Sequence, residues 1–303
     1  VWGTRMIEQL VPTLLDLGDA TSRGLAFAYR DDVEISLGEE TITETNLLAL
    51  QRRHPSRISI RTFSKKAEAD NGTDWEWNII GDVMTLRMRI QAKRINKAGQ
   101  LVGLHRKSKS AKLKQLDALI TAAKQDGVIP LYCFYSAEQH RAKWLNPNGP
   151  GDDISYEAGC LLADARKVKK LPKQSFKEVE SISVPWHFLI DTKRYQRRTF
   201  ATFHQGVSRV TTFDLLVSPI WTPKDSPELI QPSVPQDEIS LNVLGTPLLT
   251  ELNEESTGIS LTEGLVPTSL DLVAHIQKDG RDSDSAPRGA IIIDVRSRDR
   301  RDG

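Results

Sequence analysis

The segment Leu86–Lys93 constrains the fold more than any other part of the chain, because apolar and polar residues alternate along it almost without exception. A period of two is typical of a β-strand, which places successive side chains on opposite faces. The apolar face would carry Leu86, Met88, Ile90 and Ala92. The polar face would carry Arg87, Arg89, Gln91 and Lys93. A strand with one apolar face is expected to belong to a sheet that other elements cover.

The segments around this strand predict a mixed α/β (α+β) fold. Ser36 and Glu39 fit a capping box, which predicts a helix from about residue 37 to residue 54. The other expected elements are strands at 58–63 and 74–79, a helix at 112–124, a strand at 129–135, a helix at 158–168 and a short strand at 184–190. The order helix, strand, strand, strand, helix, strand indicates a mixed central sheet flanked by helices.

The last third of the chain is expected to return to the same sheet. Residues 222–285 are acidic and rich in Pro and Ser, which is typical of a linker or of an excursion from the domain. The apolar run within residues 289–296 predicts a strand of the main sheet, because an isolated strand cannot bury its apolar faces. We therefore predict one domain over residues 1–303, with a core of residues 36–190 plus the late strand.

Basic residues are concentrated around the alternating strand. Residues 83–116 contain ten Lys or Arg and no Asp or Glu, although the whole chain has a net charge of only +1. A local basic segment of this kind attracts a polyanion such as nucleic acid. The alternative is an ordinary solvated face. The candidate nucleic-acid-binding residues are Arg87, Arg89, Arg94, Arg106, Lys107 and Lys109.

Composition and motif content disfavour several other classes of protein. Cys133 and Cys160 are far apart and lack CxxC spacing, which disfavours a disulfide framework or a structural zinc site and fits a reducing cytoplasm. No apolar run is long enough to span a bilayer. The chain has no P-loop, GxGxxG, HExxH or GxSxG motif, so the activities that depend on those motifs are not expected.

Carboxylate, amide and ammonium groups are expected to meet on two neighbouring strands. Asp74 and Glu76 share a face of one strand, and Gln91 and Lys93 share a face of the next. Hydrolysis of a phosphodiester needs a divalent cation held by oxygen ligands and a cationic side chain near the phosphate. These side chains offer both kinds of group. Two acids one turn apart on the preceding helix, Glu40 and Glu44, could add a further oxygen.

These residues resemble the core of the PD-(D/E)XK restriction-endonuclease-like superfamily. The resemblance is carried by Gly72-Thr73-Asp74 and Ile90-Gln91-Ala92-Lys93, and the QxK spelling is most similar to the Mrr-like branch. The wider string, over residues 38–135, also resembles a little-characterised bacterial family with that predicted fold. The resemblance implies a restriction-endonuclease-like core and an endonuclease that depends on Mg²⁺ or Mn²⁺ and acts on nucleic acid, with DNA as the expected substrate.

The resemblance also implies roles for the site residues. The expected metal ligands are Asp74, Gln91 and Glu40, and also Glu76, which the family pattern does not require. Asp74 would be the main ligand and Gln91 would replace the usual second carboxylate, with Glu76 as a compensating acid. Lys93 would position the attacking water or stabilise the phosphorane. Gln115 would hydrogen-bond near Lys93 or the phosphate.

Each assignment has an ordinary structural alternative. Asp74 could end a turn, Gln91 and Lys93 could form an exposed strand face, and Glu40 could be an acid favoured by the helix dipole. We expect Glu40 to point toward Asp74 and Glu39 to stay at the helix end, because consecutive helical side chains are about 100° apart.

Two functions stay open from the sequence. The first is a DNA endonuclease, with a role in defence against foreign DNA by analogy with Mrr-like relatives. The second is a nucleic-acid-binding module that keeps the fold without cutting, an alternative raised by the amide at Gln91. A homo-oligomer or a partner from a defence system is compatible with either, and no membrane association is expected.

Overall fold

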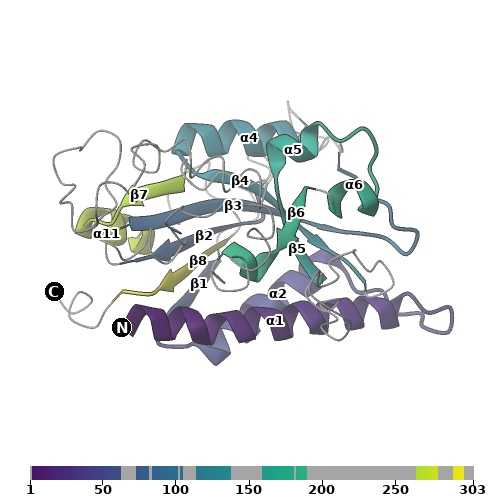
Figure 1. The fold of residues 1–303 in the computed structure, drawn as a ribbon, viewed down its shortest axis with the longest axis horizontal. Coiled ribbons are helices and arrows are strands. Elements are labelled where there is room, and N and C mark those ends of the chain that lie inside the picture. Colours follow the sequence, from purple (N-terminus) through teal and green to yellow (C-terminus); the bar gives the residue numbers. More distant parts are fainter. Residues whose placement is uncertain are drawn as a thin grey trace, which may run out of the picture.

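The structure of the protein is a computed structural model that describes residues 2–62, 73–81, 84–101, 103–104, 114–137, 159–180, 182–189, 264–278 and 289–296. Within these ranges, helices cover both faces of one eight-stranded sheet that contains parallel and antiparallel pairs (Figure 1). The predicted α/β class, with a mixed central sheet flanked by helices, is confirmed.

The elements that carry the predicted site follow one another in the expected order. They are α2 (Glu39–Arg53), β1 (Ile58–Thr62), β2 (Trp75–Ile80), β3 (Met84–Arg94), α4 (Gln115–Asp126) and β4 (Ile129–Tyr135). β2 and β3 are antiparallel neighbours, whereas β4 is parallel to β3 because α4 crosses over between them. α4 ends at Gly127, whose φ of 61° provides a left-handed cap and turns the chain directly into β4.

The late part of the chain enters the middle of the sheet. β8 (Gly289–Asp294) lies between β1 and β2, antiparallel to β1 and parallel to β2. Its three consecutive isoleucines, Ile291, Ile292 and Ile293, are all buried, as expected for a central strand with both faces covered. The strand order is β1-β8-β2-β3-β4-β5-β6, where β5 is Cys160–Asp164 and β6 is Ser183–Pro185, and β7 (Leu265–Pro267) pairs with the start of β3.

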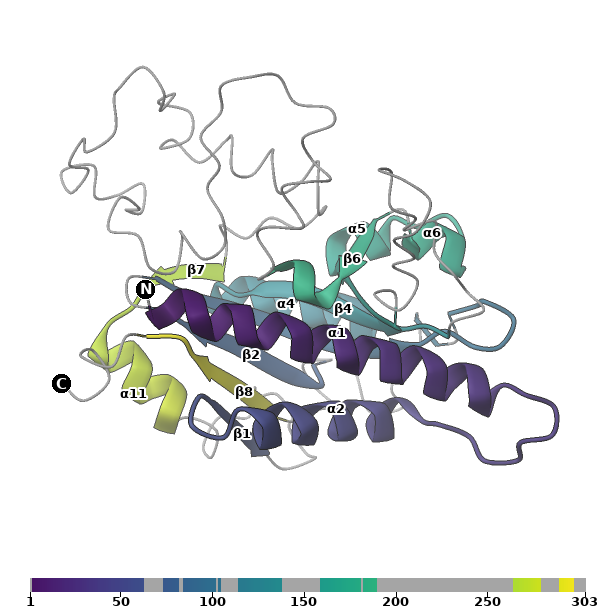
Figure 2. The same ribbon diagram turned by 60° about the horizontal axis from the view of Figure 1, so that its bottom comes forward.

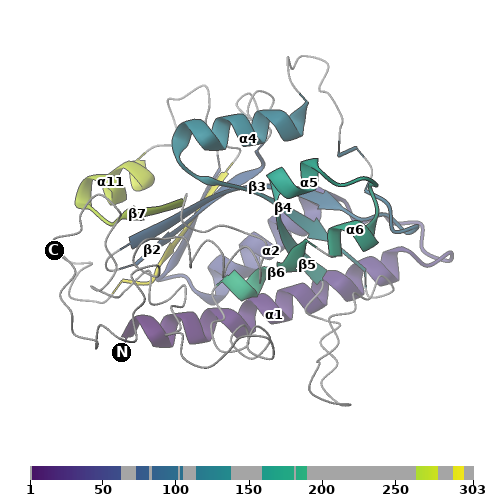
Figure 3. The ribbon, with the colours of Figure 1, turned by 45° about the horizontal axis from the view of Figure 1, so that its top comes forward.

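Helices lie on both faces of the sheet (Figures 2 and 3), and on each face a hydrophobic layer holds them in place. α1 (Trp2–Ala28) and α2 cover one face, and α4, α5 (Ala165–Lys169) and α6 (Phe176–Glu180) cover the other. Alternate residues of one strand divide between these layers: Cys133 of β4 packs toward α1 and α2, and Phe134 packs toward α4. The sheet is therefore the middle layer of a three-layer domain.

Part of the segment expected as a linker or excursion belongs to this domain. Within residues 222–285, the described residues form β7 and a helix, α11 (Leu270–Lys278). Val273 and Ile276 of this helix pack against Ile292 of β8. The acidic composition of the segment did not indicate these apolar contacts.

Two predicted elements are wrong in type or in extent. Residues 158–168 form the strand β5 and the short helix α5, because pairing with β4 overrides the helical preference of the alanines and leucines there. The helix predicted from residue 37 begins at Glu39. Its N-cap is Gly38, without a side-chain capping bond, so the capping box from Ser36 does not form.

Candidate functional site

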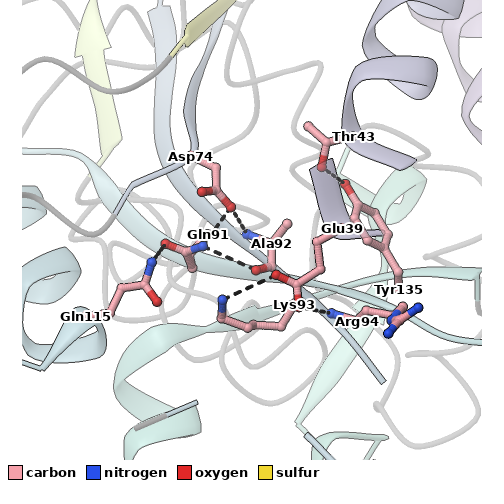
Figure 4. A network of polar contacts seen from close by, with 9 residues as sticks. All are labelled: Glu39, Thr43, Asp74, Gln91, Ala92, Lys93, Arg94, Gln115 and Tyr135. Atoms are coloured by element: carbon pink, nitrogen blue, oxygen red, sulfur yellow. Dashed lines mark hydrogen bonds and ion pairs between the residues drawn. The ribbon is translucent and has the colours of Figure 1, made fainter. Parts of the chain in front are cut away.

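The candidate site lies at the N-terminal end of β2. Beyond this point β3 continues, and its paired neighbour there is β4. The last β2–β3 pair at this end joins Trp75 and Ile90, while β3 stays paired with β4 as far as Arg94. Two carboxylates take the place of the missing strand (Figure 4). Asp74 Oδ2 accepts a hydrogen bond from the Ala92 N–H at 2.8 Å, and Glu39 Oε1 accepts one from the Arg94 N–H at 3.0 Å. The strand end therefore holds both carboxylates in defined positions.

Gln91 connects the carboxylate of Asp74 to helix α4. Its Nε2 donates to Asp74 Oδ2 at 2.7 Å and to the Ala92 carbonyl at 3.2 Å. Its Oε1 accepts from Gln115 Nε2 at 2.8 Å. Gln91 is only 2% exposed, so these three bonds fix its amide in one orientation.

The ammonium group of Lys93 lies beside Glu39, the first residue of α2. Lys93 Nζ is 3.4 Å from Glu39 Oε2. The expectation that Glu39 stays at the helix end, away from the site, is wrong. Its physical cause is the position of the helix start: Glu39 is the first residue of α2, not the third, so its side chain reaches forward to β3. Glu40 is exposed and lines the same cavity.

These side chains surround a cavity of about 160 Å³, enough for a few water molecules. Five predicted site residues line it: Glu40, Asp74, Gln91, Lys93 and Gln115. The other lining residues are Glu39, Thr43, Glu44, Leu47, Ile60, Arg61, Trp75, Ala290 and Ile291. The cavity is thus built from α2, β1, β2, β3, α4 and β8, which are far apart in sequence.

Among the lining residues that were not predicted to be part of the site, two are charged: Glu39 and Arg61. Glu39 could have been found only by placing the start of α2 two residues later. Arg61 belongs to the alternating segment at 58–63, and its only signal was a charge within an otherwise apolar and hydroxyl-bearing strand. Its place in the cavity depends on the pairing of β1 with β8, which joins segments more than 200 residues apart.

Residues 18–276 match a protein family described as a family of unknown function, DUF6615. The chain belongs to this family. No curated protein and no solved structure matches the chain. The DUF6615 match contains every cavity-lining residue except Ala290 and Ile291 of β8. No helix in the described ranges of this DUF6615 chain is long and apolar enough to cross a membrane.

Glu76 is not among the residues that line the cavity of this DUF6615 protein, so the structure does not bring it together with the other expected metal ligands. Its carboxylate lies 3.0 Å from Arg87 Nη2 and 3.4 Å from Arg89 Nε. Arg89 also pairs with Asp126 at 2.5 Å. Glu76 instead neutralises two arginines on the same face of the sheet. It lies opposite Arg89, in the pair next to the terminal Trp75–Ile90 pair.

The expected nucleic-acid face needs a matching correction. Arg89 is buried at 4% exposure and Arg87 is largely buried, and both are held by Glu76, so neither forms an open basic surface. Arg94 donates to the Leu37 carbonyl and lies over the ring of Tyr29. Arg106, Lys107 and Lys109 lie outside the described residues.

Replacing Glu76 with glutamine is expected to lower the free energy of unfolding by about 3 kcal/mol, because it leaves two poorly exposed guanidinium groups short of a negative partner. Asp126 still pairs with Arg89, which keeps the effect near the lower end for buried pairs. Urea denaturation of the variant measures this change. Glu34→Gln, at an exposed position, is the control, and equal midpoints for the two variants would contradict the prediction.

The oxygen atoms around Gln91 fit a hard divalent cation. Asp74 Oδ2 and the Ala92 carbonyl both lie within 3.2 Å of Gln91 Nε2, so a carboxylate and a carbonyl converge on one point. Mg²⁺ accepts such a set, with one or two carboxylates and several waters. Among the described residues, no three or more His, Cys, Asp or Glu side chains form a metal-binding group. A cation bound here would therefore need amide and carbonyl oxygens among its ligands.

The buried tyrosine next to this point does not provide an acid–base group. Tyr132 lies opposite Gln91 in the β3–β4 register and is fully buried. Burial, and then the negative charges of Asp74 and Asp117, raise the pKa of Tyr132 well above its ordinary value. Its phenol stays protonated at neutral pH, so Tyr132 is not a general base there.

Proposed function

We propose that this cavity hydrolyses phosphodiester bonds of nucleic acid, with DNA as substrate and with Mg²⁺ or Mn²⁺ as cofactor. The observation that supports this most is the meeting of Asp74, Gln91 and Lys93 in one small cavity at a strand end. A carboxylate, oxygen atoms suited to a hard cation, and an ammonium group are the groups that phosphodiester hydrolysis needs. The resemblance of the GTD and QxK strings to PD-(D/E)XK nucleases agrees with this chemistry.

In this proposal each side chain has a distinct task. A bound cation would stabilise charge on the scissile phosphate and lower the pKa of a water molecule. Asp74, the Ala92 carbonyl and the Gln91 amide oxygen would hold the cation. Lys93 would stabilise negative charge on the phosphate, and Glu39 would keep the Lys93 ammonium in place through their 3.4 Å ion pair. The water oxygen would bond to phosphorus and release a proton to solvent, the bond to the leaving sugar oxygen would break, and that oxygen would take up a proton from solvent.

A plasmid assay tests the proposal directly. Supercoiled DNA incubated with the purified protein is expected to become nicked or linear in Mg²⁺ or Mn²⁺ and to stay intact in EDTA. The Lys93→Met variant, purified in the same way, controls for a contaminating nuclease. Equal cutting by the variant, or equal cutting in EDTA, would remove the basis for the proposal.

Arg61 is expected to bind a phosphate of the substrate. It lines the cavity from β1, and its side chain is partly exposed. Arg61→Gln should weaken binding of duplex DNA about tenfold, because a hydrogen bond to a charged group contributes about 1.5 kcal/mol or more. The slope of log affinity against log salt should become shallower by about 0.9. Fluorescence anisotropy in EDTA measures both, with Arg52→Gln at an exposed position on α2 as control. An unchanged slope would contradict the assignment.

The alternative is a protein that binds nucleic acid without cutting it. This function is favoured by one observation: Gln91 turns its amide nitrogen toward Asp74, where the common PD-(D/E)XK pattern has a second carboxylate. Salt-dependent DNA binding with no cleavage in either metal would support this alternative.

A further inference from the structure

Three side chains form a directed chain of hydrogen bonds that ends at the proposed cation position. Gln115 Nε2 donates to Gln91 Oε1 at 2.8 Å, and Gln91 Nε2 donates to Asp74 Oδ2 at 2.7 Å (Figure 4). Every donor in this chain points from α4 toward Asp74. The direction of these hydrogen bonds is set by the orientations of the two amide groups. It can therefore reverse only if both amide groups turn.

The orientation seen in the structure is the one that suits a site without a cation. Gln91 Nε2 faces two acceptors, the Asp74 carboxylate and the Ala92 carbonyl. A turned amide would place Oε1 against these two oxygens and would withdraw the Nε2 donor from both, although Asp74 Oδ2 would keep its bond from the Ala92 N–H. Such a buried mismatch costs about 1–3 kcal/mol, so the amide nitrogen in effect stands in for a positive charge.

A cation held by Asp74 and Ala92 reverses this preference. The NH₂ group of Gln91 would then face a positive charge, whereas its Oε1 would be a ligand. The oxygen and nitrogen of an amide are nearly equal in size, so a half-turn of the terminal torsion exchanges them without repacking the core. After that turn Gln91 Nε2 would face Gln115, which would have to present its own oxygen.

We propose that Gln91 and Gln115 turn over together when a cation binds, and that Gln115 is the positioning residue that sets the cation affinity of the site. The proposal rests on the proposed function for the identity of the cation, and it concerns binding, not cleavage. In the cation-free state, the donated bond from Gln115 holds Gln91 in the orientation that excludes a ligand oxygen. Occupancy of the site is thereby transmitted to the first residue of α4.

Substitutions at Gln115 separate this relay from an ordinary structural contact. Gln115→Glu places an acceptor beside Gln91, which favours the turned amide, so the affinity for Mg²⁺ should rise about tenfold. Gln115→Lys offers only donors and should lower the affinity about tenfold. Gln125→Glu adds the same charge as the first variant at an exposed position of α4, and should change the affinity less than twofold. These values come from calorimetric titration with MgCl₂ in the absence of nucleic acid.

Side-chain amide resonances report the turn itself. In protein labelled with ¹⁵N-glutamine, the NH₂ signals of Gln91 and Gln115, assigned through Gln91→Met and Gln115→Met, should shift together with the same midpoint as Mg²⁺ is added. Saturation with Mg²⁺ while the Gln115 signals stay unchanged would overturn the relay, and so would the absence of Mg²⁺ binding at millimolar concentration. Coupled shifts without DNA cleavage would uphold the relay and count against the nuclease function instead.

Discussion

Lys93→Met is expected to lower the rate of metal-dependent DNA cleavage by about 10²–10³-fold, as the loss of one charge-stabilising group at a reacting centre commonly does. Methionine keeps an unbranched chain of similar length, so the packing of this 12% exposed side chain is retained and only the ammonium is lost. Its partner Glu39 keeps the hydrogen bond from the Arg94 N–H. The variant should therefore fold normally, and a single-turnover cleavage assay should show the loss directly.

The matched control for this variant is Lys97→Met. Lys97 lies four residues further along the chain, is half exposed and pairs with Asp31 outside the cavity. Its replacement should leave cleavage within about twofold, since an exposed pair of this kind contributes little. If Lys93→Met cuts at the wild-type rate under conditions where the wild type needs a metal, then Lys93 has no catalytic role and the nuclease proposal loses its central group.

Asp74→Asn is expected to abolish both cation binding and cleavage. Asparagine keeps the size of the side chain and one oxygen that can accept from Ala92 N–H, so the strand end should persist. The negative charge is lost, however, and it belongs to the carboxylate that Gln91 Nε2 and the Ala92 N–H both contact. Loss of an outer partner alone commonly lowers metal affinity 10–100-fold, so loss of the ligand itself should exceed about 100-fold. Calorimetry with MgCl₂ and the plasmid assay measure the two losses.

Two outcomes distinguish the role of Asp74 from a purely structural one. Asp16→Asn, at an exposed position on α1 that pairs with Arg53, is the control and should bind Mg²⁺ like the wild type. A melting temperature of Asp74→Asn close to that of wild type would show that the fold is intact. If that variant binds Mg²⁺ with unchanged affinity, the cation lies elsewhere and the proposed ligand set is wrong.

Local patterns in the sequence were sufficient to predict the elements on which the site stands. The alternation along Leu86–Lys93 placed Gln91 and Lys93 on one strand face, and both line the cavity of the folded protein. The apolar run at residues 290–293 predicted a strand of the main sheet, and the described residues there form β8. These features depend on side-chain periodicity over a few residues, which the backbone geometry of a strand converts directly into faces.

Burial and pairing of the charged residues could not be predicted in the same way. Arg87 and Arg89 were expected on a nucleic-acid face, yet the register Glu76↔Arg89 and Asn78↔Arg87 places them against a carboxylate in a covered part of the sheet. The sequence shows that these side chains share a face, but it does not show whether helices cover that part of the face. That depends on where α4 ends, because Asp126 at its last turn pairs with Arg89.

Local periodicity was enough to predict the class of the fold, the order of its central elements and the strand faces that carry Asp74, Gln91 and Lys93. Tertiary structure decided which acid meets Lys93, which arginine enters the cavity and whether residues 160–164 form a strand. Those outcomes depend on contacts between segments far apart in the chain: Glu39 with Arg94, Arg61 with Ala290, and Leu162 with Cys133. The free energy of a local conformation differs by about 1 kcal/mol or less per residue between helix and strand, so sheet pairing and burial override it.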